Sequence, residues 1–187
     1  MFENVKAVVM DVDGVLTDGT VWWGSGGQEF KRFCYADVTG IPRAQQSGIA
    51  LALVSGESSS PSIELVQRFA DKLQILDVYT GCHDKAAAVR SFAERHGVSL
   101  WEICFIGDDV QDIPAMDIVG VAVVPADGQS AAKARAHFIA SRKGGRGVVR
   151  EILDLVLESR SCSQQGSARQ ASDESAPEPA FPRPART

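Results

Sequence analysis

Two acidic side chains stand two residues apart directly after the first apolar run of the chain. Asp11 and Asp13 open the segment Asp11–Gly19, and the run Val5–Met10 before them is typical of a buried strand. Ligands of open α/β sheets bind beyond the carboxyl ends of the strands. Two carboxylates at such a point repel each other unless they share a cation or a proton. The pair therefore predicts a functional site at this strand end, and an acidic turn without a function is the alternative.

A calcium-binding loop would use a similar spacing of acidic residues. The calcium pattern DxDxDG needs an oxygen ligand at its fifth position and glycine at its sixth. Val15 and Leu16 occupy these two positions. The sequence therefore excludes a calcium loop of this kind.

A second acidic cluster follows a later apolar run. Asp108, Asp109 and Asp112 come after Ile103–Ile106. Taken alone, they fit an N-cap and an acidic first helical turn, because negative charge suits a helix N-terminus. Taken with the first acidic pair, they are expected at the same edge of one parallel sheet. Four or five carboxylates gathered there require a cation, and ligation by oxygen alone favours Mg²⁺.

Two further residues are suited to an anion. Ser55 follows the apolar run Ile49–Val54 and precedes Gly56, so its hydroxyl and nearby backbone N–H groups can hold a phosphate. Lys85 lies in the first turn of a predicted helix, where a cation opposes the helix dipole unless it meets an anion there. The ordinary alternatives are a Ser-Gly turn and a solvated lysine.

Together these residue types compose a phosphoryl-transfer site. A carboxylate nucleophile forms an aspartyl-phosphate intermediate. A second carboxylate protonates the leaving oxygen and later deprotonates water. Mg²⁺ and Lys85 offset the negative charge on the transferring oxygens. The sequence therefore predicts an enzyme that transfers a phosphoryl group.

The elements that must position these residues alternate between strand-like and helix-like patterns. Short apolar runs predict strands at Val5–Met10, Ile49–Val54, Gln74–Val78, Ile103–Ile106 and Val119–Val124. Helical patterns are found at Asp37–Gln46, Ser60–Phe69, Asp84–His96, Gln129–Ala136 and Gly147–Glu158. This alternation predicts an α/β fold, a Rossmann-like parallel sheet with helices on both faces.

The segment Thr20–Phe33 interrupts the alternation. Trp22 and Trp23 precede a glycine-rich stretch at 24–27, and a second short strand pattern follows it. Two strands around a glycine-rich turn predict a β-hairpin. Its place directly after the first acidic motif suits a flap over the site, and the two tryptophans suit packing against another subunit equally well.

Length and composition predict one folded domain over residues 1–160 and a tail over 161–187. The 187 residues, 44% of them hydrophobic and 23% charged, are ordinary for a globular protein with one core. The tail consists mostly of Ser, Gln, Ala, Pro and Arg. Such a segment buries too little apolar surface to offset its ordering entropy, so we expect it to be disordered.

Charge, cysteines and apolar runs restrict the class of protein. The net charge of −5 argues against a nucleic-acid partner. The four cysteines lack the spacing of a zinc site, which favours free thiols in a reducing compartment. No stretch approaches the ~20 apolar residues of a membrane helix, and no signal peptide is recognisable. We therefore expect a cytoplasmic protein without a membrane partner.

The order of the motifs resembles that of the haloacid dehalogenase superfamily of phosphotransferases. The matching residues are Asp11-Val12-Asp13-Gly14, Ser55-Gly56, Lys85, and Gly107-Asp108-Asp109 with Asp112. More narrowly, Asp11–Gly19 and Gly144–Glu151 resemble the opening and closing segments of the branch that contains 3-deoxy-D-manno-octulosonate 8-phosphate phosphatase and its nine-carbon relatives. The resemblance extends over roughly residues 5–158.

The resemblance implies a role for each motif residue. Asp11 would be the nucleophile and Asp13 the general acid/base. Asp11, the backbone carbonyl of Asp13 and Asp108 would hold Mg²⁺. Support for the metal would come from Asp109 or Asp112.

The resemblance also implies how substrate and subunits are arranged. Ser55 and Lys85 would bind the transferring phosphoryl group, and the substrate side would include Thr17, Gly56, Glu57 and Arg146. The substrate would be a small sugar-acid phosphate of lipopolysaccharide or capsule biosynthesis. The branch has no large cap domain and resembles homotetramers in which the hairpin meets neighbouring subunits.

The chain departs from the pattern of the octulosonate enzymes at two places. Glu57 stands where those enzymes usually have arginine, and it resembles relatives that act on KDN and N-acetylneuraminate 9-phosphates. Asp37-Val38 replaces a typical Asp-Gly. Both changes are expected near the substrate, so they bear on its identity more than on the chemistry. A carboxylate at 57 would repel a substrate carboxylate but accept hydrogen bonds from sugar hydroxyls.

Other classes of protein use some of the same residue types. A phospho-acceptor receiver domain also uses Asp, Ser or Thr, Lys and Mg²⁺, but there the lysine follows the acidic residues, whereas Lys85 precedes the second acidic cluster. A P-loop enzyme is excluded because GxxxxGK[ST] does not occur. A non-catalytic or regulatory family member stays open.

Overall fold

The computed structural model describes residues 1–173 of the chain. Its centre is one sheet of six parallel strands in the order β5-β4-β1-β6-β7-β8. The strands are β1 (Ala7–Asp11), β4 (Ala50–Val54), β5 (Asp77–Tyr79), β6 (Ile103–Ile106), β7 (Val121–Val124) and β8 (Phe138–Ile139). The predicted Rossmann-like α/β fold is confirmed.

The strand order creates one switch point in the sheet. From β1 the chain builds outward through β4 to β5, then returns to the other side of β1 and continues through β6, β7 and β8. Ligands of open α/β sheets bind in the crevice beyond the strand ends at such a point. Here that crevice lies between β1 and β6, and each of these strands leads directly into one acidic motif.

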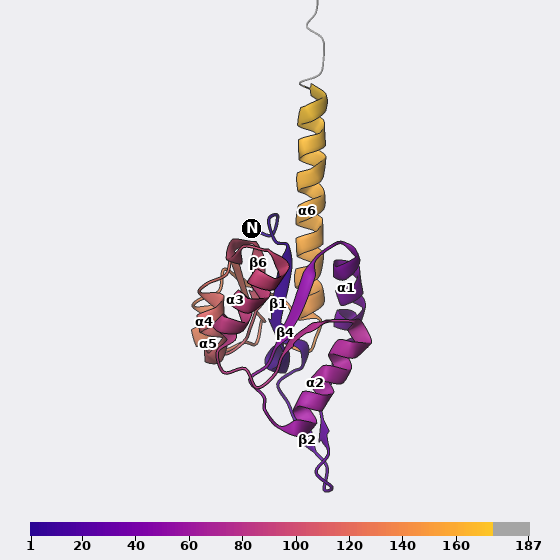
Figure 1. Cartoon of the computed structure of the whole chain (residues 1–187), viewed down its shortest axis with the longest axis vertical. Helices are drawn as coiled ribbons and strands as arrows, with labels where there is room; N and C mark the ends of the chain where they lie inside the picture. The colour runs from indigo at the N-terminus through magenta and orange to yellow at the C-terminus, as the bar shows by residue number, and fades with distance from the viewer. Residues whose placement is uncertain (174–187) are drawn as a thin grey trace, which may run out of the picture.

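Alternation along β1 supplies a core on each face of the sheet. Val8 and Met10 pack into one cluster, and Ala7 and Val9 pack into the other. The first cluster is covered by α1 (Tyr35–Gln46), α2 (Ser60–Leu73) and α6 (Val148–Asp173). The second is covered by α3 (Lys85–His96), α4 (Ile113–Met116) and α5 (Ser130–Lys133). Figure 1 shows these two groups of helices on opposite sides of the strands.

The predicted hairpin is also confirmed. Strands β2 (Trp22–Trp23) and β3 (Glu29–Phe30) pair antiparallel and form their own small sheet. In Figure 1 the hairpin projects from the end of the body opposite to the free end of α6. Within residues 1–173 it is the main excursion from the sheet and its helices, and no large cap domain is inserted.

Helix α6 is longer than its sequence pattern predicts. We expected the helix to end near Glu158 and a disordered tail to begin at 161, but α6 continues to Asp173. The stretch 161–173 contains Gln, Ala and Arg, which favour helix, and the next proline after Pro125 is Pro177. The rest of the predicted tail, 174–187, lies outside the described residues.

The remaining differences concern element ends and short elements. Strand β8 has two residues and was not predicted, because so short a run has no periodicity to detect. Helix α5 is shorter than the predicted Gln129–Ala136. Short turns complete the described chain: η1 (Val12–Leu16), η2 (Leu100–Glu102) and η3 (Val110–Asp112). No helix in the described part of the chain is both long enough and apolar enough to span a membrane.

Candidate active site

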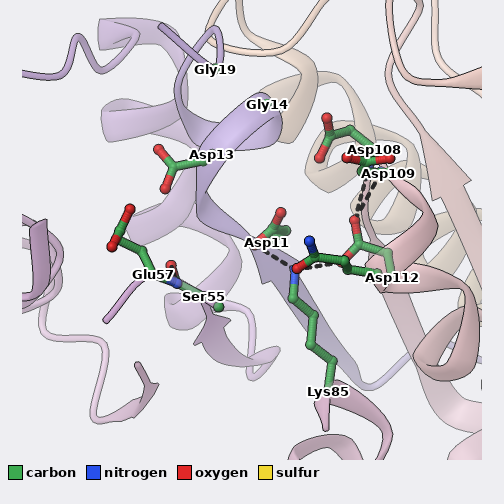
Figure 2. A pocket seen from close by; sticks show the side chains of 12 residues that line it. Asp11, Asp13, Gly14, Gly19, Ser55, Glu57, Lys85, Asp108, Asp109 and Asp112 are labelled. Atoms are coloured by element: carbon green, nitrogen blue, oxygen red, sulfur yellow. Dashed lines mark hydrogen bonds and ion pairs between the residues drawn. The ribbon is translucent and has the colours of Figure 1, made fainter. Parts of the chain in front are cut away.

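The acidic motifs meet in one pocket at the carboxyl edge of the sheet. The pocket has a volume of about 420 Å³. Its lining residues are Asp11, Asp13, Gly14, Gly19, Ser55, Gly56, Glu57, Lys85, Asp108, Asp109, Gln111 and Asp112. Figure 2 shows Asp11 and Lys85 at its centre, with Ser55 and Glu57 on one side and Asp112 on the other. Four sequence motifs thus converge as the strand order requires.

Asp11 ends β1 and is almost completely buried, with 6% of its surface exposed. Its Oδ1 lies 2.9 Å from the Lys85 Nζ. Burial and the neighbouring Asp112 carboxylate raise the pKa of Asp11 well above its ordinary value, while Lys85 opposes the increase. The Lys85 ammonium therefore does not fully offset the burial of this carboxylate, and a second cation nearby would favour its ionised form.

Lys85 begins α3 and is buried beside two carboxylates. Its Nζ also lies 2.6 Å from the Asp112 Oδ1. Burial lowers the pKa of Lys85, but Asp11 and Asp112 outweigh it and the net change is upward. The helix dipole disfavours a cation at this position, so the two carboxylates explain why a lysine is tolerated there.

Asp112 organises the loop that follows β6. Its Oδ1 accepts from Lys85, and its Oδ2 accepts from the backbone N–H groups of Asp108 (2.8 Å) and Asp109 (3.1 Å). A Cβ at Gly107 would lie 2.5 Å from the Asp112 Cγ, so only glycine fits beside this carboxylate. Asp112 is fully buried and fixes the direction in which Asp108 faces the pocket.

Three carboxylates are close enough to share a cation. Oxygens of Asp11, Asp108 and Asp112 lie within 4.8 Å of one another. Burial, together with the Asp112 and Asp109 carboxylates, raises the pKa of Asp108 to about 7, so a cation beside it would favour the ionised form. A donor set made only of oxygen fits Mg²⁺. The fourth carboxylate, Asp109, lies outside this group of three, and its Oδ1 accepts from the Val110 N–H.

Gly14 allows the two acidic motifs to approach. Its φ is +86°, a conformation that L side chains rarely adopt. A Cβ there would also lie 2.2 Å from the Asp108 Oδ2. The turn η1 therefore needs glycine both for its backbone and for the space that Asp108 occupies.

Asp13 lies in η1 on another side of the pocket from Asp108 (Figure 2). Its Oδ1 accepts from the Thr17 Oγ1 at 3.1 Å, and its Oδ2 lies 2.8 Å from the Lys31 Nζ. Thr17 was expected to contact substrate, but it is fully buried and does not line the pocket. Its hydroxyl instead helps to orient Asp13, because Thr17 ends the same turn and donates to that carboxylate.

Ser55 and Glu57 form the wall that follows β4. The Ser55 N–H donates to the Tyr79 carbonyl at 2.7 Å, and its hydroxyl accepts from the Glu57 N–H at 3.2 Å. The Glu57 Oε1 accepts from the N–H groups of Ser58 (2.8 Å) and Ser59 (2.9 Å), just before α2. Hydrogen bonds from Ser59 and Ser58 lower the pKa of Glu57. Glu57 is therefore an ionised pocket residue whose carboxylate also fixes the loop that leads into α2.

The glycine pair of the closing segment contacts the turn that carries Asp13. A Cβ at Gly144 would lie 1.9 Å from the Gly14 carbonyl oxygen, and one at Gly145 would lie 2.5 Å from the Asp18 nitrogen. The Gly145 N–H donates to the Val15 carbonyl at 2.9 Å. Arg146 was expected on the substrate side, but it is exposed and does not line the pocket. In this segment the two glycines, and not the arginine, pack against the turn that carries Asp13.

Two side chains differ from what the sequence indicates. Asp37 was expected near the substrate, but it is fully buried and its Oδ1 accepts from the Arg150 N–H at 2.7 Å, near the start of α6. Lys31 was not singled out, yet it contacts Asp13. The contact between Lys31 and Asp13 depends on how the chain returns from the hairpin to the body. Hydrophobic periodicity does not predict this arrangement.

Known proteins share both the sequence and the fold. Residues 60–152 match the family model of haloacid dehalogenase-like hydrolases. Over 155 residues the chain is 36% identical to the 3-deoxy-D-manno-octulosonate 8-phosphate phosphatase of Salmonella typhi, a match that covers 83% of this chain and 80% of that protein.

Two solved structures are similar over most of the chain. The 3-deoxy-D-manno-octulosonate 8-phosphate phosphatase of Moraxella catarrhalis, in complex with magnesium ion, phosphate ion and a KDO molecule, has a TM-score of 0.81 at 33% identity and covers 90% of this chain and 94% of its own. The Yersinia pestis enzyme also has a TM-score of 0.81, at 34% identity, and the match covers 86% of this chain and 84% of that chain. The chain therefore belongs to the haloacid dehalogenase-like hydrolases, in the family of the 3-deoxy-D-manno-octulosonate 8-phosphate phosphatases.

Proposed function

We propose that this protein is a Mg²⁺-dependent phosphatase that hydrolyses a 2-keto-3-deoxy sugar-acid phosphate through an aspartyl-phosphate intermediate. The observation that carries the proposal is the contact of Asp11 with Lys85 beside Asp108, with Asp13 on another wall of the same pocket. A nucleophile, a cation site and an acid/base group thus share one small volume.

The residues divide the reaction between them. The Asp11 carboxylate attacks phosphorus as the ester P–O bond breaks, and Asp13 gives a proton to the leaving sugar oxygen. Asp13 then takes a proton from water as that water attacks phosphorus and releases Asp11. Lys85 and the Ser55 hydroxyl offset and orient the phosphoryl oxygens. Asp11, the Asp13 carbonyl and Asp108 would hold Mg²⁺, which supplies further charge stabilisation when bound, and Asp112 and Asp109 would support them.

The relatives and the pocket bear on the substrate in different ways. The relatives named above act on 3-deoxy-D-manno-octulosonate 8-phosphate, which supports the eight-carbon acid. Glu57 lines the pocket as an anion and favours a nine-carbon acid such as KDN 9-phosphate or N-acetylneuraminate 9-phosphate. Its hydrogen bonds to the loop before α2 give Glu57 a structural role as well, so we give the octulosonate ester first place.

Exposed aromatic side chains on the hairpin support the proposal of a homotetramer. Trp22 and Trp23 are 71% and 79% exposed, and Phe30 is 58% exposed. An apolar group of this kind on one projecting element fits a subunit interface. We further propose that residues 1–160 form the catalytic domain. The free thiols of Cys34, Cys82 and Cys104 support a reducing compartment such as the cytoplasm.

The first experiment is phosphate release with Mg²⁺ from octulosonate 8-phosphate, KDN 9-phosphate, N-acetylneuraminate 9-phosphate and hexose phosphates. We expect a sugar-acid phosphate to lead in kcat/KM by tenfold or more, about 1.4 kcal/mol of transition-state preference. Asp11→Asn is the control and should be inactive. Lack of turnover of every ester, or activity retained in Asp11→Asn, would instead support a non-catalytic family member.

A further inference from the structure

Lys31 is a buried ammonium that the reaction scheme does not yet use. It follows β3 in the second arm of the hairpin, and its side chain is 1% exposed. Its Nζ contacts the Asp13 Oδ2 at 2.8 Å and the Ser62 Oγ, and the Glu29 Oε1 lies 3.8 Å away. A buried lysine is costly unless it is paired and hydrogen-bonded. The groups that pair with the Lys31 ammonium therefore indicate its role.

The hairpin arm is held in place by the two residues that directly follow Lys31. The Arg32 Nη2 lies 2.5 Å from the Asp18 Oδ2, and the Phe33 ring stacks on Phe69 of α2 with centroids 4.1 Å apart. Ser62, the second hydrogen-bond partner of Lys31, lies in the first turn of the same helix and is fully buried. The ammonium is thus fixed by contacts to the body and not by the exposed hairpin tip.

Lys31 and Thr17 together determine how the Asp13 carboxylate is oriented. Thr17 donates to one oxygen of Asp13 and Lys31 donates to the other. Asp13 lines the pocket, whereas Lys31 and Thr17 lie outside its lining. Lys31 therefore contacts the pocket through the Asp13 carboxylate, and its charge also helps to lower the pKa of the nearby Glu57. Catalytic groups gain their efficiency from supporting contacts of this kind, which hold them within a narrow range of positions.

We propose that Lys31 is the positioning residue of the acid/base Asp13, and that the second arm of the hairpin holds it in place. The inference rests on the proposed phosphatase function. The proton that Asp13 gives to the leaving oxygen, and later recovers from water, moves between fixed atoms only while the carboxylate is held against the pocket. Lys31 exchanges no proton in either step and supplies charge and direction.

The test uses the dependence of the rate on the leaving group. A sugar-acid phosphate leaves as an alkoxide that needs the proton of Asp13, whereas p-nitrophenyl phosphate leaves as a stable phenolate that does not. Lys31→Met should lower kcat for the sugar-acid ester about 10²-fold, the lower range of general acid catalysis. For p-nitrophenyl phosphate kcat should change by less than about threefold, within the scatter of an unselective substitution. Lys31→Arg, which keeps the charge, should recover most of the lost rate.

Two further variants complete the design. Lys6→Met removes a lysine that pairs with Glu102 on the surface and is 59% exposed. It should leave both rates unchanged. Asp13→Asn should show the same selective loss as Lys31→Met, and the double variant should lose little more, because coupled residues are not additive. If Lys31→Met fails to fold, Ser62→Ala takes its place. This variant should also lower kcat for the sugar-acid ester and not for p-nitrophenyl phosphate, by a smaller factor.

The outcomes separate this inference from the proposed function. Equal losses on both esters, or no loss on either, would leave Lys31 a structural residue and overturn the inference while wild-type activity still upholds the phosphatase. If the wild-type protein hydrolyses no ester, the proposed function falls and the inference falls with it. Loss confined to the sugar-acid ester supports both.

Discussion

The Nζ of Lys85 lies 2.9 Å from the Oδ1 of Asp11, so a helix that follows β5 places its first residue against the last residue of β1. The same ammonium contacts Asp112 at 2.6 Å. One cation therefore serves the nucleophile and the carboxylate that shapes the β6 loop. The active-site geometry depends on a pairing between segments more than seventy residues apart in sequence.

Loss of Lys85 is expected to affect stability as well as activity. Lys85→Met leaves two buried carboxylates without their cation, and breaking such a pair costs about 3–5 kcal/mol. The free energy of unfolding, measured in urea without Mg²⁺, should fall by this amount, and added Mg²⁺ should restore part of it. Lys133→Met, which removes a contact to the Ala126 carbonyl away from the pocket, serves as the control. An unchanged free energy of unfolding in Lys85→Met would contradict the pairing seen here.

Magnesium should stabilise the fold in a manner that does not depend on turnover. A ligand that binds only the folded protein at 100 times its Kd adds about 2.7 kcal/mol. We expect Mg²⁺ to raise Tm and EDTA to reverse the increase. Asp108→Asn should lose most of the Mg²⁺-dependent shift, whereas Asp117→Asn, which removes a surface partner of Arg135, should keep it. Equal shifts in both variants would argue against Asp108 as a ligand.

The buried Asp37 should make stability depend on pH. Burial raises its pKa to about 6, despite the hydrogen bond from the Arg150 N–H. Between about pH 4 and 6 the folded protein holds a proton that the unfolded chain has released, so its contribution to stability falls as pH rises through this window. The loss is about 1–3 kcal/mol and is complete above about pH 6.

The measurement compares wild type with Asp37→Asn, which keeps an acceptor for Arg150. Urea unfolding at several pH values should give a difference in unfolding free energy that moves in favour of the variant as pH rises from 4 to 7. A difference that does not vary with pH would show that Asp37 titrates normally. Asp117→Asn again provides the exposed comparison.

Gly144 should tolerate no side chain. A Cβ at Gly144 would lie 1.9 Å from the Gly14 carbonyl oxygen, so the turn that carries Asp13 would have to move. Gly144→Ala is expected to cost about 1–3 kcal/mol, as overpacking does, and to lower kcat because Asp13 is displaced. Gly26→Ala meets only the end of the flexible Gln28 side chain, so its Tm and kcat should match the wild type. A normal kcat in Gly144→Ala would separate the glycine pair from the site.

The sequence by itself determined the alternation of strands and helices, the hairpin, and the place of each acidic motif at a strand end. These features depend on local patterns, because apolar runs and glycine-rich turns act over a few residues. Asp11, Ser55, Lys85 and Asp108 could be selected for the same reason, since each stands beside a strand or helix boundary. The switch point between β1 and β6 then brings them together.

Only the tertiary structure decided which side chains face the pocket and which support it. Thr17 is buried and donates to Asp13, and Asp37 is buried and accepts from the Arg150 N–H. Arg146 lies outside the pocket lining. Lys31 reaches Asp13 because the chain returns from the hairpin to the body, where Phe33 stacks on Phe69. Such contacts join residues distant in sequence through packing and charge, and no local propensity encodes them. The composition after residue 160 suits disorder as well as helix, so the sequence did not predict that α6 continues to Asp173.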